Sequence, residues 1–132
     1  MKPEEKDLLL KDLCGRLPYE PIVEYVLKAF GGGNATMTCT LDTIHLEDLL
    51  QDSEDLVHIK PYLRPMSSMT EEEREEYEKT LEIDYQDMLP EPIYHKTLDS
   101  YYYLLEHHFD FQGLIPAGCA IKVTEDNNPY KD

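Results

Sequence analysis

The chain has no tryptophan and three cysteines in 132 residues, and its 12 lysines and arginines face 28 aspartates and glutamates. The net charge of −16 argues against sequence-independent binding to nucleic acid, which needs clustered positive charge to contact phosphates. No apolar run approaches the roughly 18 residues of a membrane-spanning helix. The first residues are charged, so we expect no secretory signal. These absences exclude a membrane protein and predict no direct contact with nucleic acid.

The three cysteines, Cys14, Cys39 and Cys119, are isolated in the sequence, without a C-x-x-C pair. An odd number without such a pair indicates neither a disulfide framework nor a zinc knuckle. We therefore expect three structural thiols on apolar faces, in a reducing and hence cytoplasmic compartment. Catalysis by Cys119 with a nearby histidine stays open, although no local pattern supports it.

An apolar content of 41%, with ten tyrosines, is too high for a disordered acidic chain. The length fits one domain, which we place at residues 1–123, followed by a frayed tail at 124–132. Helical and strand-like segments are mixed along the chain. The fold class we expect is a small α+β domain, with about three helices on an antiparallel sheet of three to four strands.

The first half of the chain predicts a helix followed by a hairpin. Residues 3–17 have a helical face made of Leu10, Leu13, Cys14 and Leu17. Strands at 22–30 and 35–41 flank a glycine-rich turn, and the second strand should point Met37, Cys39 and Leu41 inward. The glycines lack the following lysine of a phosphate loop. Residues 43–51 fit either a strand or a helix, and 60–65, with two prolines, fit an extended connector at a sheet edge.

The second half predicts two helices and a closing strand. Thr70 and Glu73 form a capping box, which indicates a surface helix from about 70 to 80. Residues 82–95 contain two prolines among acids and are typical of a mobile loop. A helix follows with an apolar face that we expect to be Leu98, Tyr101, Tyr102, Leu105 and Phe109. Residues 119–123 fit a short final strand.

Two segments carry most of the negative charge: residues 42–55 have a net charge of −6 and residues 71–92 of −8. A run of acids usually forms a solvated surface, and it also suits a basic partner or a mimic of DNA phosphates. Tyr103 falls off the apolar face of its helix, which predicts an exposed anchor for a protein partner. The residues we expect to take part in partner binding are Tyr103, Glu72, Glu75, Glu76, Lys60, Tyr62 and Arg64. The last three form a local positive patch, which we expect to pair with the chain's own acids.

The densest set of metal-ligand types is His107, His108 and Asp110, with Glu106 and His95 nearby. Adjacent histidines in a helix point about 100° apart, and the i, i+4 spacing of zinc-binding helices is missing. The sequence therefore predicts no metal, no cofactor and no catalytic residue. These histidines are only weak candidates for metal ligands.

Three blocks resemble a family of small proteins of unassigned function from gut-bacterial genomes, often near prophage or mobile-element genes. They are L-L-L-K-D-L-C-G-R-L-P-Y at 8–19, K-P-Y-L-R-P-M-S-S-M-T-E-E-E at 60–73 and H-F-D-F-Q-G-L-I at 108–115. The resemblance implies a bacterial cytoplasmic protein and supplies no catalytic residues.

The function we expect is that of a non-enzymatic, acidic protein–protein interaction module of a bacterial or mobile-element gene. The first alternative is an acidic decoy that mimics DNA and occupies a DNA-binding protein. The second is a small metal- or cysteine-dependent enzyme that uses His107, His108 or Cys119. The sequence does not indicate an oligomeric state.

Overall fold

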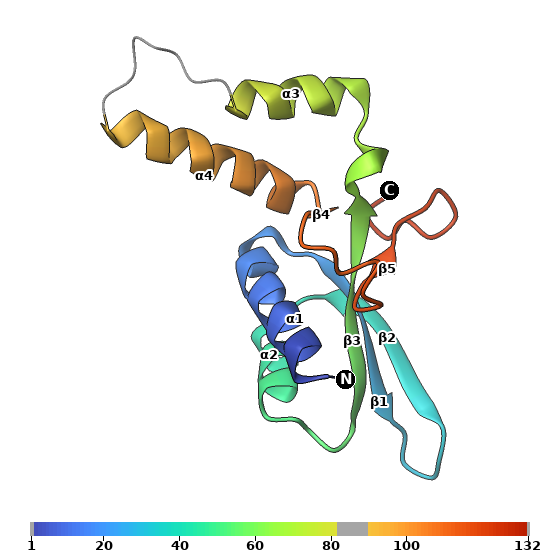
Figure 1. Ribbon diagram of the computed structural model, residues 1–132. Coiled ribbons are helices and arrows are strands. Elements are labelled where there is room, and N and C mark those ends of the chain that lie inside the picture. Colours follow the sequence, from blue (N-terminus) through green and yellow to red (C-terminus); the bar gives the residue numbers. More distant parts are fainter. Residues whose placement is uncertain (1, 82–89, 132) are drawn as a thin grey trace.

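The computed structural model describes residues 2–81 and 90–131, without the side chains of 90–97. Its helices and strands are mixed along the chain (Figure 1). In order they are α1 (Pro3–Arg16), η1 (Leu17–Tyr19), β1 (Ile22–Lys28), β2 (Asn34–Thr40), α2 (Thr43–Leu50), β3 (Leu56–Pro65), η2 (Met66–Ser68), α3 (Glu71–Leu81), α4 (Pro90–Glu106), β4 (Phe109–Asp110) and β5 (Ile121–Lys122). The expected α+β class is confirmed.

The sheet has the strand order β2-β1-β3-β4, and β5 also pairs with β3. β1 is antiparallel to both β2 and β3, as expected for a hairpin and its neighbour. β4 and β5 run parallel to β3, so the sheet is mixed and the prediction of a purely antiparallel sheet was wrong. The reason is that α3 and α4 form a crossover from β3 to β4, and a crossover of this kind returns the chain in the same direction.

β3 is a central strand of ten residues, which corrects the expected edge connector. Pro61 lies opposite Val23 of β1. Val23 forms its ladder hydrogen bonds with β2, so the Val23–Pro61 pair is a non-hydrogen-bonded one. The N–H that proline lacks would therefore point away from β1. On that side β5 pairs with Tyr62 and Leu63 and β4 with Arg64 and Pro65, so Pro61 is locally at an edge, where a strand tolerates proline.

α1 and α2 lie together on one face of the sheet (Figure 1). The buried core between them and the sheet contains Leu9, Leu13, Val23, Tyr25, Leu41, Leu49, Ile59, Leu63, Leu114 and Cys119. In α1 the buried face is Leu9, Asp12, Leu13 and Arg16, one position away from the predicted face, and Cys14 is exposed. The spacing of apolar residues predicted the wrong face because two of the four buried residues, Asp12 and Arg16, are charged and form an ion pair.

The segment 43–50, left open by the sequence, is a helix. Asp42 is its N-cap, and the Asp42 carboxylate accepts a hydrogen bond from the Ile44 N–H. β2, which precedes it, is almost wholly exposed, and Met37 is 48% exposed although we expected it to point inward. β2 is the outermost strand, so the helices that cover the central strands do not cover it.

α3 and α4 pack against each other and project from one end of the sheet (Figure 1). The capping box is confirmed, since Glu73 N–H donates to Thr70 Oγ1 and Thr70 N–H donates to Glu73 Oε1. α3 buries no side chain, as expected of a surface helix. α4 begins at Pro90, so the predicted loop was wrong for residues 90–95, while 82–89 lie outside the described residues. Prolines are tolerated in the first turn because those N–H groups have no helical partner.

Residues 124–131, expected to fray, fold back on the sheet through Tyr130. Its hydroxyl donates to the Tyr62 carbonyl (2.8 Å) and accepts from the Ile22 N–H (3.0 Å). The Tyr130 ring stacks on His108, with 3.9 Å between centroids and 9° between planes. These contacts hold the end of the described chain against β1 and β3.

Candidate interaction surface

We call the pair of helices α3 and α4 the acidic arm. One ion pair joins it to the sheet: Arg64, near the end of β3, donates to both Glu73 carboxylate oxygens at 2.7 and 2.6 Å. The Arg64 guanidinium also lies 4.2 Å from the centre of the Phe109 ring. The hydrogen bond from Arg64 lowers the pKa of Glu73 to about 2. The first turn of α3 is therefore fixed to β3 by a charged, bidentate contact.

One of the two cations of the predicted positive patch is thereby neutralised. Lys60, Tyr62 and Arg64 alternate along β3, so they share a face as expected, and all three are half-buried. Arg64 pairs with an acid of the same chain, as the sequence analysis anticipated. The guanidinium is occupied, so the patch does not offer a partner the charge that its sequence indicates.

Tyr103 is not the exposed residue we expected. It is half-buried between the two helices of the acidic arm, and its hydroxyl lies within hydrogen-bond distance of two acceptors, the Glu73 carbonyl (3.1 Å) and the Glu76 carboxylate (3.0 Å). Its ring lies 5.9 Å from Tyr77 and 4.2 Å from His107. Burial and the Glu76 hydrogen bond raise the pKa of Tyr103. The side of α4 that looks polar in sequence is the side that α3 covers.

The opposite side of α4 exposes tyrosines that we expected in the core. Tyr101 is 39% and Tyr102 44% exposed, and Leu98 is exposed beside them. The Tyr101 ring lies 5.5 Å from Phe111 in an edge-to-face arrangement, and a Cβ at Gly15 would come within 2.9 Å of the Tyr101 hydroxyl. Among the side chains of α4 that the structure describes, the buried ones are Ser100, Leu104 and Leu105. The exposed rings therefore form an aromatic surface where the arm meets α1.

The acids of α3 mostly face solvent. Glu71, Glu72, Glu75, Glu76 and Glu78 are exposed, and among the residues that the structure describes none of them forms an ion pair. Glu72, Glu75 and Glu76 have the i, i+3, i+4 spacing that places side chains on one side of a helix. Three of the predicted binding residues are thus brought together as an exposed anionic surface.

The metal-ligand candidates do not converge. Nδ1 of His107 lies 3.8 Å from Glu73, whereas His108 is directed at Tyr130. Asp110 accepts hydrogen bonds from the N–H groups of Leu114 and Ile115, both at 2.9 Å. Among the side chains of residues 2–81 and 98–131 no three potential ligands come close enough to hold a metal ion, and the side chain of His95 lies outside those described.

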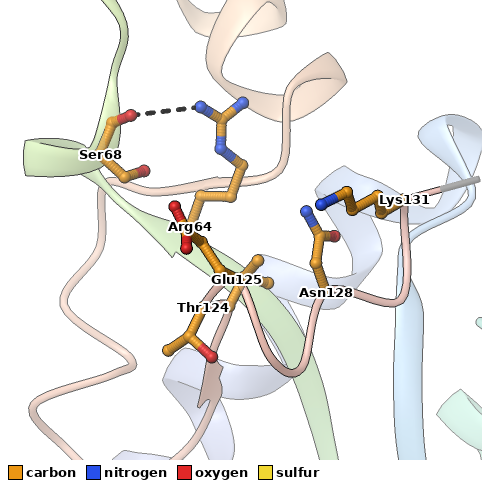
Figure 2. Close-up of a pocket in the computed structure, with 7 residues that line it drawn as sticks. Arg64, Ser68, Thr124, Glu125, Asn128 and Lys131 are labelled. Atoms are coloured by element: carbon orange, nitrogen blue, oxygen red, sulfur yellow. Dashed lines mark hydrogen bonds between the residues drawn. The ribbon is translucent and has the colours of Figure 1, made fainter.

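A cavity of about 520 Å³ lies between the end of β3 and the C-terminal segment. Figure 2 shows Arg64, Ser68, Thr124, Glu125, Asn128 and Lys131 around it. The Arg64 guanidinium turns toward the Ser68 carbonyl, on the side away from Lys131 (Figure 2). Because Arg64 is already bound to Glu73 and a carboxylate also lines the cavity, the cations there do not form an anion site.

Cys14, which we expected on an apolar face inside the protein, is exposed in a groove between α1 and α2. The groove has a volume of about 590 Å³ and is lined by Leu10, Lys11, Cys14, Thr43, Leu46, Glu47 and Leu50. Cys39 is half-buried and Cys119 is buried, so the expected setting holds best for Cys119.

No family model, curated protein or solved structure is significantly similar to this chain. Across the residues that the structure describes, no helix has both the length and the apolar character needed to span a membrane.

Proposed function

We propose that this protein is a non-enzymatic interaction module that binds a basic protein through its acidic arm. The observation that carries the proposal is the α3 surface made by Glu72, Glu75 and Glu76, which is exposed on a helix that projects from the domain and forms no ion pair among the residues that the structure describes. Carboxylates that already paired with local lysines or arginines would be less available to a partner. Here Arg64 is bound to Glu73, and no described ion pair joins Arg74 or Lys79 of α3 to these three acids.

The exposed rings of Tyr101 and Tyr102 support the same proposal. Tyrosine is enriched at protein interfaces because it combines a large apolar ring with a polar hydroxyl. Tyrosine faces also attract arginine and lysine through cation–π interactions. A surface with both carboxylates and tyrosines thus suits a partner segment rich in arginine, with the rings giving affinity and the acids steering its approach.

The test has two stages. The tagged protein captures partners from a bacterial lysate at low and high salt, and mass spectrometry identifies them. Binding of the purified partner is then measured by calorimetry for the wild type, for E72Q/E75Q/E76Q and for Y101S/Y102S. We expect a basic partner, an affinity about tenfold lower for the glutamine variant, equivalent to about 1.4 kcal/mol, and a weakening of wild-type binding as salt rises.

The matched control is E4Q/E54Q/E125Q, which removes the same charge from exposed sites outside the arm. Its affinity should stay near that of the wild type, because dispersed charges contribute little to one contact. Equal loss in both glutamine variants would mean that only total charge matters and would contradict the assignment to the arm. A DNA-binding protein that duplex DNA displaces from the wild type would instead support the decoy alternative.

A further inference from the structure

A second surface, at the edge of the sheet formed by β2, has no charged side chain. Residues 29–41 form a run of 13 without a charged side chain, in a chain where 30% of residues are charged. This run makes the β1–β2 turn and all of β2, the outermost strand of the sheet. Natural sheet edges are commonly protected by lysines, prolines or bulges. β2 has none of these, and its register with β1 is continuous.

The backbone groups at this edge can be assigned from two hydrogen bonds. Leu41 N–H donates to the Pro21 carbonyl and Ala29 N–H donates to the Gly33 carbonyl, so the odd-numbered residues of β2 bond to β1. The N–H and C=O groups of Asn34, Thr36, Thr38 and Thr40 therefore point outward. No described residue pairs with them.

We propose that two copies of this chain associate through antiparallel pairing of their β2 strands around a two-fold axis at Met37. Only the even-numbered residues of β2 have outward N–H and C=O groups, so the hydrogen-bonded pairs between the two copies must join even-numbered residues. A register centred on Met37 does this. Thr36 then faces Thr38 of the second copy, a cross-strand pair that stabilises sheets. A two-fold axis makes every contact occur twice, as in most homodimers.

The exposed apolar side chains at the two ends of β2 fit this arrangement. Phe30, in the turn before β2, is fully exposed, and Ile44, in the first turn of α2, is 61% exposed. Antiparallel pairing brings the turn of one copy beside the start of α2 in the other. Two contacts between Phe30 and Ile44 would then flank the paired strands. They would remove from water two of the most exposed large apolar side chains of the domain.

Charge favours a second copy over other occupants. Each copy has a net charge of −16, so two copies repel each other. The repulsion is weakest when the copies meet through surfaces without charged side chains, as at β2. Added salt should therefore strengthen the dimer, whereas it should weaken a complex of the acidic arm with a basic partner. The opposite responses to salt separate this proposal from the proposed function, on which it does not depend.

The experiment is sedimentation equilibrium of the purified full chain over a range of concentrations and salt. We expect a mass that rises from the 15.4 kDa of the chain toward twice that value, and more so at high salt. T38P should remain monomeric and folded, because its N–H points outward and is not needed by β1. F30S should weaken the dimer at least tenfold, and L50S, which changes another exposed large apolar residue away from β2, should not.

A cross-link tests the register. In a C14S background, M37C should form an intermolecular disulfide under mild oxidation, since non-hydrogen-bonded antiparallel pairs bring Cα atoms to about 4.5 Å, within the range of disulfides. A monomer at every concentration and salt would overturn the proposal. So would a dimer that T38P leaves intact, and an uncross-linked M37C dimer would overturn the pairing centred on Met37.

Discussion

Asp12 and Arg16 form a fully buried ion pair within α1. The Arg16 guanidinium donates to the Asp12 carboxylate at 2.6 and 3.1 Å, and both side chains are 0% exposed. Arg16 also donates to the Phe109 carbonyl at 2.7 Å, and Gln112 donates to Asp12 at 2.9 Å. One turn of the first helix is thus tied to residues nearly a hundred positions later, where α4 leads into β4.

D12A should destabilise the fold by about 3–5 kcal/mol, because it leaves the Arg16 charge buried without its carboxylate. The control is D7A, which breaks the exposed pair Asp7–Lys11 at the same i, i+4 spacing in the same helix. That change should cost less than about 0.5 kcal/mol. Urea unfolding of both variants measures the difference. Equal costs would contradict the importance that the structure gives to the buried pair.

E73Q should reduce the free energy of unfolding at pH 7 and make that free energy depend less on pH in the acid range. The ion pair with Arg64 lowers the pKa of Glu73 to about 2 from an ordinary 4.5, so its stabilisation is complete above pH 4.5 and is lost as pH falls toward 2. The loss at pH 7 should be on the order of 2 kcal/mol, while glutamine can still cap α3. Unfolding followed at several pH values measures it, with E72Q as an exposed control in the same helix. A constant gap between wild type and E73Q down to pH 2 would contradict the ion-pair account.

His108 should titrate far below an ordinary histidine. Burial lowers its pKa to about 4 from 6.5, and the nearby positive charge of Arg16 contributes a smaller part of this decrease. Between these values the unfolded chain binds more protons, so stability should fall as pH drops from 6.5 to 4, by up to ~1.4 kcal/mol per unit. NMR of the ring protons measures the pKa directly.

H108N is the matching variant, because asparagine tolerates the left-handed backbone at this position (φ 62°). Its stability should depend less on pH between 4 and 6.5, with the dependence above 6.5 unchanged. A His108 resonance that titrates near 6.5 would show that the ring is not buried as described.

Y130F should cost about 1–3 kcal/mol, because it removes the hydroxyl that links the Tyr62 carbonyl to the Ile22 N–H while it keeps the ring on His108. The control Y102F removes an exposed hydroxyl and should stay within about 0.5 kcal/mol of the wild type. Urea unfolding measures both. A neutral Y130F would mean that the two hydrogen bonds of the Tyr130 hydroxyl do not contribute to stability.

Local patterns in the sequence predicted the features that a few neighbouring residues decide. The α3 capping box depends on Thr70 and Glu73 alone, and the hairpin depends on alternating residues around a glycine turn. The surface position of α3 followed from its composition. In the candidate site, the exposure of Glu72, Glu75 and Glu76 was predictable for the same reason, since α3 has too few apolar residues to be buried.

Only the tertiary structure decided which face of each element is covered, because the covering residues come from distant parts of the chain. α3 covers Tyr103 and leaves Tyr101 and Tyr102 exposed, which reverses the expectation from α4 alone. The parallel pairing of β4 and β5 with β3 likewise depends on a crossover whose path no local spacing reveals. Composition and periodicity determined that this is an acidic α+β domain. Long-range packing determined which of its tyrosines and charges are exposed, because a side chain is buried only when another part of the chain covers it.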